Sequence, residues 1–527
     1  MLTQKEMVKV RIYVYHKFFD AVVHELGKLA VLHQTEAKDE FPDSQGKVVP
    51  VEPDERYHTV RSLLSQSESL METLQLDPSH SRLQTETPDE ESISELIAEI
   101  DAQLESGVAP PHAASVFGER LRSAAATLRA EVARQEFQAK CGQTDKTKLM
   151  IGWIPREDLP STMSRLLEVS QKQLEYTVVT SPSPGATPPS EISFPTRSPI
   201  LRSFSKLTTS FSAPGYPEID PTLFQLVTYP LFFGLMFGDA GQGPFLLLVG
   251  LGAEYLRRKG YRSGNLVNMV VDNAPFVVLL GLASAIIGAV NYGVVFGSAN
   301  WGHVLRELMG IGFLNSKDVW EIPFVFGVGI PVVFEPFENP LLLFKLSLII
   351  GTFHITLGIA LSIIDHLREG ERVDAFVGPG TWLIFYLSGV YVLFQMLSKG
   401  VTFAFSPDAM YVVLPPILLM FASRGIVHKG LGINESLESL LQSLSHTISY
   451  SRILAMAMIH SVLSLIFLGD LFGLAWPINL FTVAAGSVVI LLLEGMLSMI
   501  QTIRLHWVEW FTKFYVGNGV KYTPFSL

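Results

Sequence analysis

The sequence has little cysteine and, over most of its length, little charge. Cys141 is the one cysteine among 527 residues, which excludes a disulfide framework and a metal site built from several cysteines. Residues 201–527 hold 38 charged side chains among 327 residues, whereas the first 200 residues hold 51. The composition therefore argues against a wholly soluble globular protein and predicts a membrane domain after residue 200.

Other missing features exclude further classes of function. The net charge is −11 and neither part of the chain is basic overall, which argues against a nucleic-acid partner. The first 20 residues lack the unbroken apolar run of a signal peptide, so we expect the N-terminal part to be cytoplasmic. The chain has no GxxxxGK[ST], HExxH or CxxC motif. We therefore predict no nucleotide site, no metal and no cofactor, and energy for any coupled work must arrive through a partner.

Residues 1–180 have the pattern of an α/β domain. Apolar residues alternate in the segment 8–14, and the segments 149–154 and 176–180 have similar character, which predicts three strands. Apolar residues spaced 4-3-4 over 93–104 and over 121–132 predict two helices, separated by Pro110 and Pro111. We expect them to form a short helical-hairpin (coiled-coil) arm at about 90–140; the alternative is an ordinary helical pair packed on the sheet. The segment 181–217 is rich in Pro, Ser and Thr and is predicted to be a linker.

Residues 218–527 are predicted to form an α-helical membrane domain with about eight transmembrane helices. The last two apolar stretches are long enough to require tilting or projection beyond the bilayer. Lys and Arg concentrate in alternate loops, which predicts that both termini are cytoplasmic. The eight stretches are approximately 222–238, 242–256, 275–296, 340–364, 379–398, 409–422, 436–468 and 474–512.

Charged and polar residues interrupt the last two stretches, where an ion at mid-bilayer costs at least ~2.5–3.5 kcal/mol. In the seventh stretch, five polar residues spaced 4, 3, 4 and 3 share one helical face. They are Glu438, Gln442, Ser445, Ser449 and Arg452. His460 follows Arg452 by two turns, ~12 Å along a helix.

In the eighth stretch, Glu494, Gln501 and Arg504 lie roughly on one face. Two polar helix faces, each surrounded by apolar side chains that face lipid or partner helices, suit a pathway for protons or small cations. Alternatively, Arg452 and Arg504 pair with Glu438 and Glu494 only to lock the bundle. His460 alone could equally be a satisfied interior histidine.

A glycine-rich segment, FGLMFGDAGQG at 233–243, places Asp239 between the first two stretches. Asp239 could line the channel or could simply cap a helix. The glycines around it could serve close helix packing.

Five motifs, in order along about the last 375 residues, resemble the membrane stator subunit (subunit a or subunit I) of vacuolar/archaeal-type rotary ATPases. They are GWIP at 152–155, YPEIDPT at 216–222, FFGLMFGDAGQG at 232–243, SYSRILAMAMIH at 449–460, and the segment from EGMLSMIQTIRLHW to YTPF at 494–525. A collinear set of this kind is far more specific than any single motif.

The resemblance implies roles for individual residues. Arg452 matches the family's essential arginine, which faces the rotor, and Arg504 and Gln501 match its supporting residues on the last helix. The remaining matches are to ionisable or polar channel positions: His460, Glu494, Glu438, Gln442 and Asp239.

The resemblance also implies partners and a place in the cell. The chain would form two half-channels against the ring of rotor proteolipids and couple proton or sodium transport to ATP hydrolysis or synthesis, without being catalytic itself. It would contact peripheral-stalk, central-stalk and ATPase head subunits, and we expect it in a prokaryotic plasma membrane. Two departures stand out: the N-terminal domain is shorter than in typical members, and Gln242 replaces a histidine or tyrosine.

Two other functional classes remain open from the sequence. A stand-alone secondary transporter or channel is compatible with eight helices and midplane charges. The large N-terminal domain, the lack of an evident internal repeat and the collinear motifs count against it. A purely structural membrane anchor would not need the two polar faces.

Overall fold

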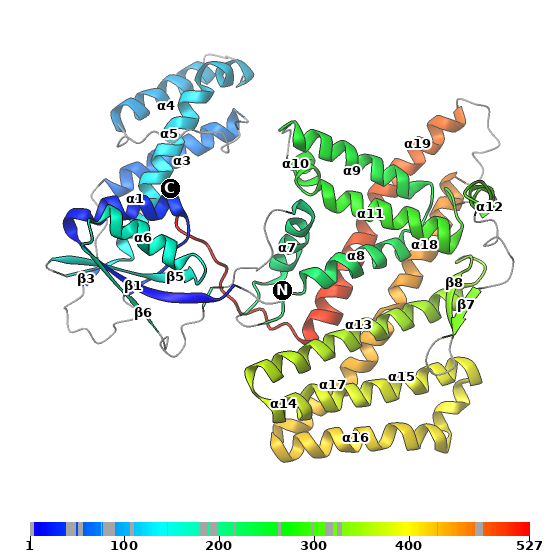
Figure 1. Cartoon of the computed structure of the whole chain (residues 1–527). Coiled ribbons are helices and arrows are strands. Elements are labelled where there is room, and N and C mark those ends of the chain that lie inside the picture. Colours follow the sequence, from blue (N-terminus) through cyan, green and yellow to red (C-terminus); the bar gives the residue numbers. More distant parts are fainter. Residues whose placement is uncertain are drawn as a thin grey trace. The chain divides into compact units, whose positions relative to one another are not determined.

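The computed structural model describes residues 5–37, 49–50, 56–74, 76, 90–105, 110–144, 146–179, 188–189, 198–215, 218–261, 265–297, 299–310, 320–323, 329–428, 430–468 and 478–526. These residues form two compact units (Figure 1). The N-terminal unit comprises residues 4–193 together with 519–527, and the helical unit comprises residues 194–518 with the first three residues.

An antiparallel sheet is the centre of the N-terminal unit. Its strands are β1 (Met7–Tyr15), β2 (His33–Thr35), β3 (Val49–Pro50), β4 (Gly142–Gln143), β5 (Thr147–Pro155) and β6 (Leu174–Val178). They lie in the order β3-β4-β5-β1-β6, with β2 also paired to β5. The helices α1 (Phe19–Leu29) and α6 (Leu159–Val169) contribute to one core with the alternate β1 residues Val10, Ile12 and Val14. The three predicted strands are confirmed; residue 180, at the end of the third, lies outside the described residues.

Three further helices belong to this unit: α3 (Tyr57–Thr73), α4 (Glu90–Glu105) and α5 (Pro110–Ala139). They share a hydrophobic core that is separate from the core of the sheet. The sequence predicted two of them and missed α3. The helical-hairpin arm at about 90–140 stays a prediction. Pro110 begins α5, because proline is tolerated in the first turn of a helix, where its missing N–H has no partner to lose.

The last residues of the chain belong to the N-terminal unit. The Phe525 amide donates to the Leu32 carbonyl at 2.9 Å, and the Phe525 ring lies 4.3 Å from that of Phe137. Nearby, Cys141 is buried and its thiol donates to the Phe137 carbonyl. Burial raises the pKa of Cys141 to about 12, so the thiol stays protonated at neutral pH.

Helices dominate the second unit. In chain order they are α7 (Pro199–Phe211), α8 (Thr222–Met236), α9 (Gln242–Arg258), α10 (Asn265–Asp272), α11 (Ala274–Ile287), α12 (Ala299–Leu308), α13 (Pro340–Glu369), α14 (Arg372–Ala375), α15 (Thr381–Lys399), α16 (Pro407–Val427), α17 (Gly430–Ser449), α18 (Ser451–Leu468), α19 (Ile478–Ile490) and α20 (Met496–Arg504). A small hairpin, β7 (Trp320–Pro323) with β8 (Gly329–Val333), precedes α13. The helix α7 lies inside the predicted linker, where Phe204 and Thr208 face a core although Pro and Ser surround them in the sequence.

Within the described ranges, five helices are long and apolar enough to cross a membrane: Ala274–Tyr292, Pro340–Glu369, Arg372–Lys399, Pro407–Val427 and Val483–Lys513. A shorter apolar helix, Thr222–Met236, adds to them. These helices indicate an integral membrane protein. That the protein has eight transmembrane helices stays a prediction.

The last two predicted stretches are not uniform α-helices. The seventh breaks at Tyr450 into α17 and α18, and the Tyr450 hydroxyl bonds to His354 Nδ1 of α13 at 2.7 Å. The eighth contains two π-helical turns, Leu491–Gly495 and Leu505–Trp510, on either side of α20. A π turn adds a residue to the helical turn, so it shifts the face on which later residues lie.

Glycines allow close packing between α9 and α11. A Cβ added at Gly281 would lie 2.5 Å from the Leu247 amide nitrogen, and one added at Gly243 would collide with the backbone of Ala285. The alternative that these glycines serve helix packing is therefore supported for Gly243, which belongs to the glycine-rich motif.

We expect Gly281→Ala to destabilise the protein, because the added methyl group must push α9 and α11 apart at a cost of about 1–3 kcal/mol. Gly252→Ala on α9 is the matched control, since nothing lies within 4 Å of its added Cβ. Thermal unfolding of the purified chain in detergent should show a lower midpoint for Gly281→Ala and an unchanged or higher midpoint for Gly252→Ala. Equal midpoints would show that the close approach is not required.

Candidate functional site

Arg452 forms an ion pair with a residue that the sequence analysis missed. Its Nη1 lies 2.8 Å from Oε1 of Glu509, which belongs to the second π turn and is 1 % exposed. Its Nη2 donates to Ser449 Oγ at 3.2 Å across the break at Tyr450. The second carboxylate oxygen of Glu509 is buried and has no hydrogen-bond partner in the described structure.

A buried triad lies two turns further along α18. His460 Nδ1 is 2.9 Å from Glu494 Oε2, and His460 Nε2 is 3.7 Å from Asp239 Oδ2. All three side chains are at most 4 % exposed. Glu494 lies in the first π turn of the last helix. His460 is thus neither isolated nor packed only among apolar groups; it joins two acidic residues from different helices.

Asp239 has two roles that the sequence left as alternatives. Its Oδ1 accepts hydrogen bonds from the amides of Gly241 and Gln242, so it caps the start of α9. Its Oδ2 accepts a bond from the Gly297 amide and faces His460. Gln242 is buried, and its side-chain Nε2 donates to Ser464 Oγ of α18 at 3.3 Å.

A second polar series lies on the other side of Arg452. Gln442 Nε2 donates to Glu438 Oε1 at 2.9 Å, and Lys513 Nζ donates to Gln442 Oε1 at 3.1 Å. Lys513 is buried and was not predicted as a site residue. In the part of the chain that the structure describes, Glu438 thus bonds to Gln442 of the same helix and not to an arginine.

The hypothesis that Arg452 and Arg504 lock the bundle by pairing with Glu438 and Glu494 is wrong. Arg452 pairs with Glu509, and Glu494 pairs with His460. The side chain of Arg504 is exposed, and among the residues that the structure describes it has no hydrogen-bond or ion-pair partner.

The other predicted site residues are not all brought together. Gln501 is half-buried, and its Oε1 is a buried atom without a partner in the described ranges. Ser445 is exposed, and its carbonyl accepts a bond from Ser449 Oγ at 2.9 Å. Along the last helix, Glu494 is buried, Gln501 is half-buried and Arg504 is exposed, and a π turn contains Glu494. Their common face stays a prediction.

No group of three or more His, Cys, Asp or Glu side chains with the arrangement of a metal site occurs among the described residues. The residues described above offer a fixed cation and titratable groups. Carboxylates on both sides of a guanidinium, with an imidazole on one side, can bind and pass protons or hold a small cation.

Comparison with known proteins gives the site a context. Residues 133–431 and 426–527 match the sequence profile of the V-type ATPase 116 kDa subunit family. A-type ATP synthase subunit I of Methanocaldococcus jannaschii is 24 % identical over 421 residues, which cover 76 % of this chain and 58 % of the relative.

Two further relatives are similar. The vacuolar proton translocating ATPase 100 kDa subunit of Dictyostelium discoideum is 24 % identical over 71 % of this chain and 58 % of its own length. A-type ATP synthase subunit I of Archaeoglobus fulgidus is 29 % identical over 64 % of this chain and 53 % of its own length. The chain thus spans a little over half the length of the curated relatives it matches.

We expect Glu509→Gln to lower the free energy of unfolding by about 1.5–3 kcal/mol, the typical contribution of a hydrogen bond to a charged group. Glu68→Gln is the control, because Glu68 pairs with Arg129 in an exposed ion pair of the kind that contributes about 0–1 kcal/mol. Thermal unfolding of the purified variants in detergent measures the difference. If both variants unfold at the same temperature, Glu509 is not needed to stabilise Arg452.

Proposed function

The chain belongs to the V-type ATPase 116 kDa subunit family, and on this premise we propose that it is the ion-translocating stator subunit of a V/A-type rotary ATPase. As a member of that family it is a membrane subunit and not the catalytic one. In our proposal it provides two half-channels against a ring of rotor proteolipids. It thereby couples the transport of protons, or of sodium, to ATP hydrolysis or synthesis.

One observation carries the proposal: a paired arginine lies between two separate sets of titratable and polar side chains. His460 follows Arg452 by eight residues within α18, about 12 Å at 1.5 Å per helical residue, whereas Gln442 precedes Arg452 and lies on α17, before the break at Tyr450. The triad around His460 and the series through Gln442 therefore lie on opposite sides of Arg452. Two polar paths that end near one fixed cation are what two offset half-channels require.

The physical logic concerns a carboxylate on the rotor. While such a group faces lipid it must be neutral, because an unpaired ion in a low-dielectric medium costs far more than a protonated acid. Close to the guanidinium of Arg452 the ionised form is favoured, so the carboxylate releases its proton or ion into one half-channel. An arginine suits this role because its guanidinium remains charged even where it is poorly hydrated.

Glu509 adds a second element to this mechanism. Its Oε1 holds Nη1 of Arg452, which fixes the direction of the guanidinium before a rotor carboxylate arrives. Its Oε2, buried and without a partner in the described structure, provides an acceptor at the point where the transferred ion would leave or arrive. Glu509 is thus proposed to be a positioning residue for Arg452.

The remaining parts of the proposal concern topology and partners. Eight crossings, with both termini cytoplasmic, would place Glu438 and Gln442 towards the cytoplasm and His460 and Glu494 towards the opposite side. The N-terminal unit would contact peripheral-stalk subunits, and the whole complex would include central-stalk and ATPase head subunits in a prokaryotic plasma membrane. Family membership disfavours the alternative of a stand-alone transporter or channel.

We expect Arg452→Ala to abolish ATP-driven ion pumping while the complex still assembles, because the substitution removes the fixed cation. Arg504→Ala should reduce pumping less, since Arg504 is exposed and lies outside both polar series. The measurement is ion uptake into proteoliposomes that contain the purified complex, with ATP hydrolysis and subunit composition recorded for each variant.

The matched control for these variants is Arg258→Ala, which removes an exposed arginine that only pairs with Glu254. It should pump as the unsubstituted complex does. Normal pumping by an assembled Arg452→Ala complex would refute the proposed role. If Arg452→Ala and Arg504→Ala are both harmless, these charges serve structure alone.

A further inference from the structure

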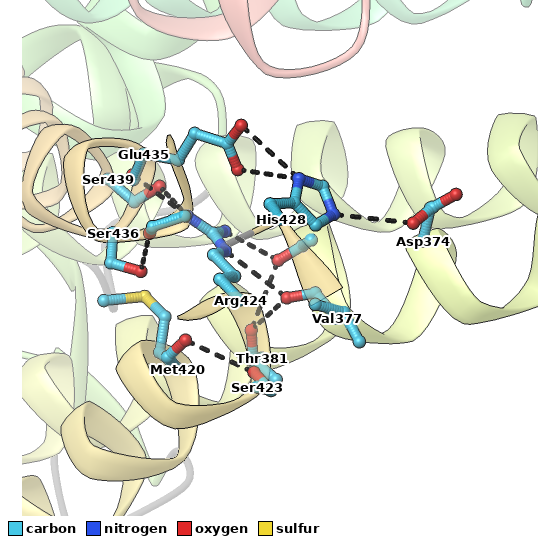
Figure 2. Close-up of polar contacts among 12 residues, drawn as sticks. Asp374, Val377, Thr381, Met420, Ser423, Arg424, His428, Glu435, Ser436 and Ser439 are labelled. Atoms are coloured by element: carbon cyan, nitrogen blue, oxygen red, sulfur yellow. Dashed lines mark hydrogen bonds and ion pairs between the residues drawn. The ribbon is translucent and has the colours of Figure 1, made fainter. Parts of the chain in front are cut away.

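A second histidine lies between two carboxylates, at a place that the two polar series do not include. His428 is the C-cap residue of α16. Its Nε2 is 3.5 Å from Asp374 Oδ1 on α14, and its Nδ1 is 3.2 Å from Glu435 Oε2 on α17. Figure 2 shows the imidazole between the two acids, with each ring nitrogen directed at one of them. The arrangement repeats that of the buried His460 triad.

The two triads differ in their access to water. The side chains of Asp374, His428 and Glu435 are 43 %, 30 % and 46 % exposed, whereas those of the His460 triad are at most 4 % exposed. Protons can therefore exchange between bulk water and the His428 triad without any movement of the protein. This triad has the chemistry of a surface group that collects protons, and not that of an interior relay.

Arg424 holds the three elements of the His428 triad in place. It lies one turn before His428 on α16 and is 4 % exposed. Its guanidinium donates four hydrogen bonds: to the carbonyls of Val377, Gly378 and Glu435, and to Ser439 Oγ (Figure 2). The first two acceptors lie in the π-helical turn that follows α14, and the other two lie on α17. Among the residues that the structure describes, the charged groups that face His428 are Asp374 and Glu435, and the Arg424 guanidinium bonds to the four acceptors above.

A polar connection leads inward from the triad. Glu435 precedes Glu438 by three residues on α17, so the two carboxylates are neighbours on the helix surface. Glu438 accepts from Gln442, and Gln442 accepts from Lys513. Lys513 lies one turn after Glu509, the partner of Arg452. Named side chains thus lead from exposed His428 to the buried ion pair.

We propose that Asp374, His428 and Glu435 form a proton-loading station at the mouth of the half-channel that contains Glu438 and Gln442. The inference rests on the proposed stator function and adds to it the entry point and the nature of the ion. Imidazole takes up a proton from water or from a buffer acid and, as imidazolium, releases it to the Glu435 carboxylate; the neutral ring is then ready for the next proton. Glu435 passes the proton to Glu438, and the station returns to its starting state of two carboxylates and a neutral ring.

The test is ATP-driven proton uptake into proteoliposomes that contain the purified complex with His428→Gln, measured at low buffer concentration. Glutamine keeps a polar side chain but cannot carry a proton. We expect pumping to fall on the order of tenfold, less than the 10²–10⁴-fold that a positioned acid or base contributes, because the two carboxylates remain. Added imidazole should restore the rate, since a mobile proton carrier replaces the missing ring.

His366→Gln is the matched control. His366 is near the C-terminal end of α13. Its Nδ1 bonds to the Ser362 carbonyl, and within the described ranges it has no carboxylate partner. It should pump at the unsubstituted rate at every buffer concentration. If the His428→Gln complex does not assemble, His428→Asn, which also cannot carry a proton, is tested with the same expected result.

Several outcomes would overturn the loading station. They are an unchanged rate for His428→Gln at low buffer, a loss that imidazole does not restore, and pumping that follows sodium instead of protons. Arg452→Ala separates this inference from the proposed function: added imidazole should not restore its activity. If Arg452→Ala pumps normally, the stator role fails. If Arg452→Ala is inactive and His428→Gln is unaffected, only the loading station fails.

Discussion

The ion pair between Arg452 and Glu509 is the interaction on which the rest of the polar arrangement depends. A charge in the middle of apolar helices costs at least ~2.5–3.5 kcal/mol, and the loss of one partner from a buried pair leaves the other uncompensated. The chain meets this constraint by placing a carboxylate 2.8 Å from the guanidinium. The pair holds the Arg452 guanidinium inside the helical unit. The titratable groups around His460 and around Glu438 lie on either side of it.

Irregular backbone makes this arrangement possible. The break at Tyr450 separates α17 from α18, and Arg452 still reaches Ser449 across it. The two π turns of the last helix contain Glu494 and Glu509, the acidic partners of His460 and Arg452. A π turn opens the helix by one residue, and such turns occur often at functional sites. The two buried carboxylates thus lie where the backbone departs from the α-helix.

Features that depend on local sequence pattern could be predicted from the sequence. Apolar spacing predicts the three strands and the helices α4 and α5. The cost of a charge in an apolar segment singles out Arg452, His460 and Glu494 as site residues. Glu509 was missed because its partner Arg452 lies on another helix, and the spacing of residues along one helix does not show contacts between helices. Phe525 packs against residues near the start and middle of the N-terminal unit, far from it in sequence. Arg424 likewise bonds to backbone carbonyls more than 40 residues earlier in the chain. No local pattern in the sequence encodes contacts of this kind.

The measurement that tests the central claim most directly is purification of the tagged chain in mild detergent, followed by mass spectrometry of its partners. The stator account predicts that small rotor proteolipids and ATPase head subunits are recovered with it, since the Arg452–Glu509 pair has a function only against a rotor carboxylate. Recovery of the chain alone, stable and monodisperse, would contradict this account. Arg452 would then have to act on a substrate or a gate within the chain itself.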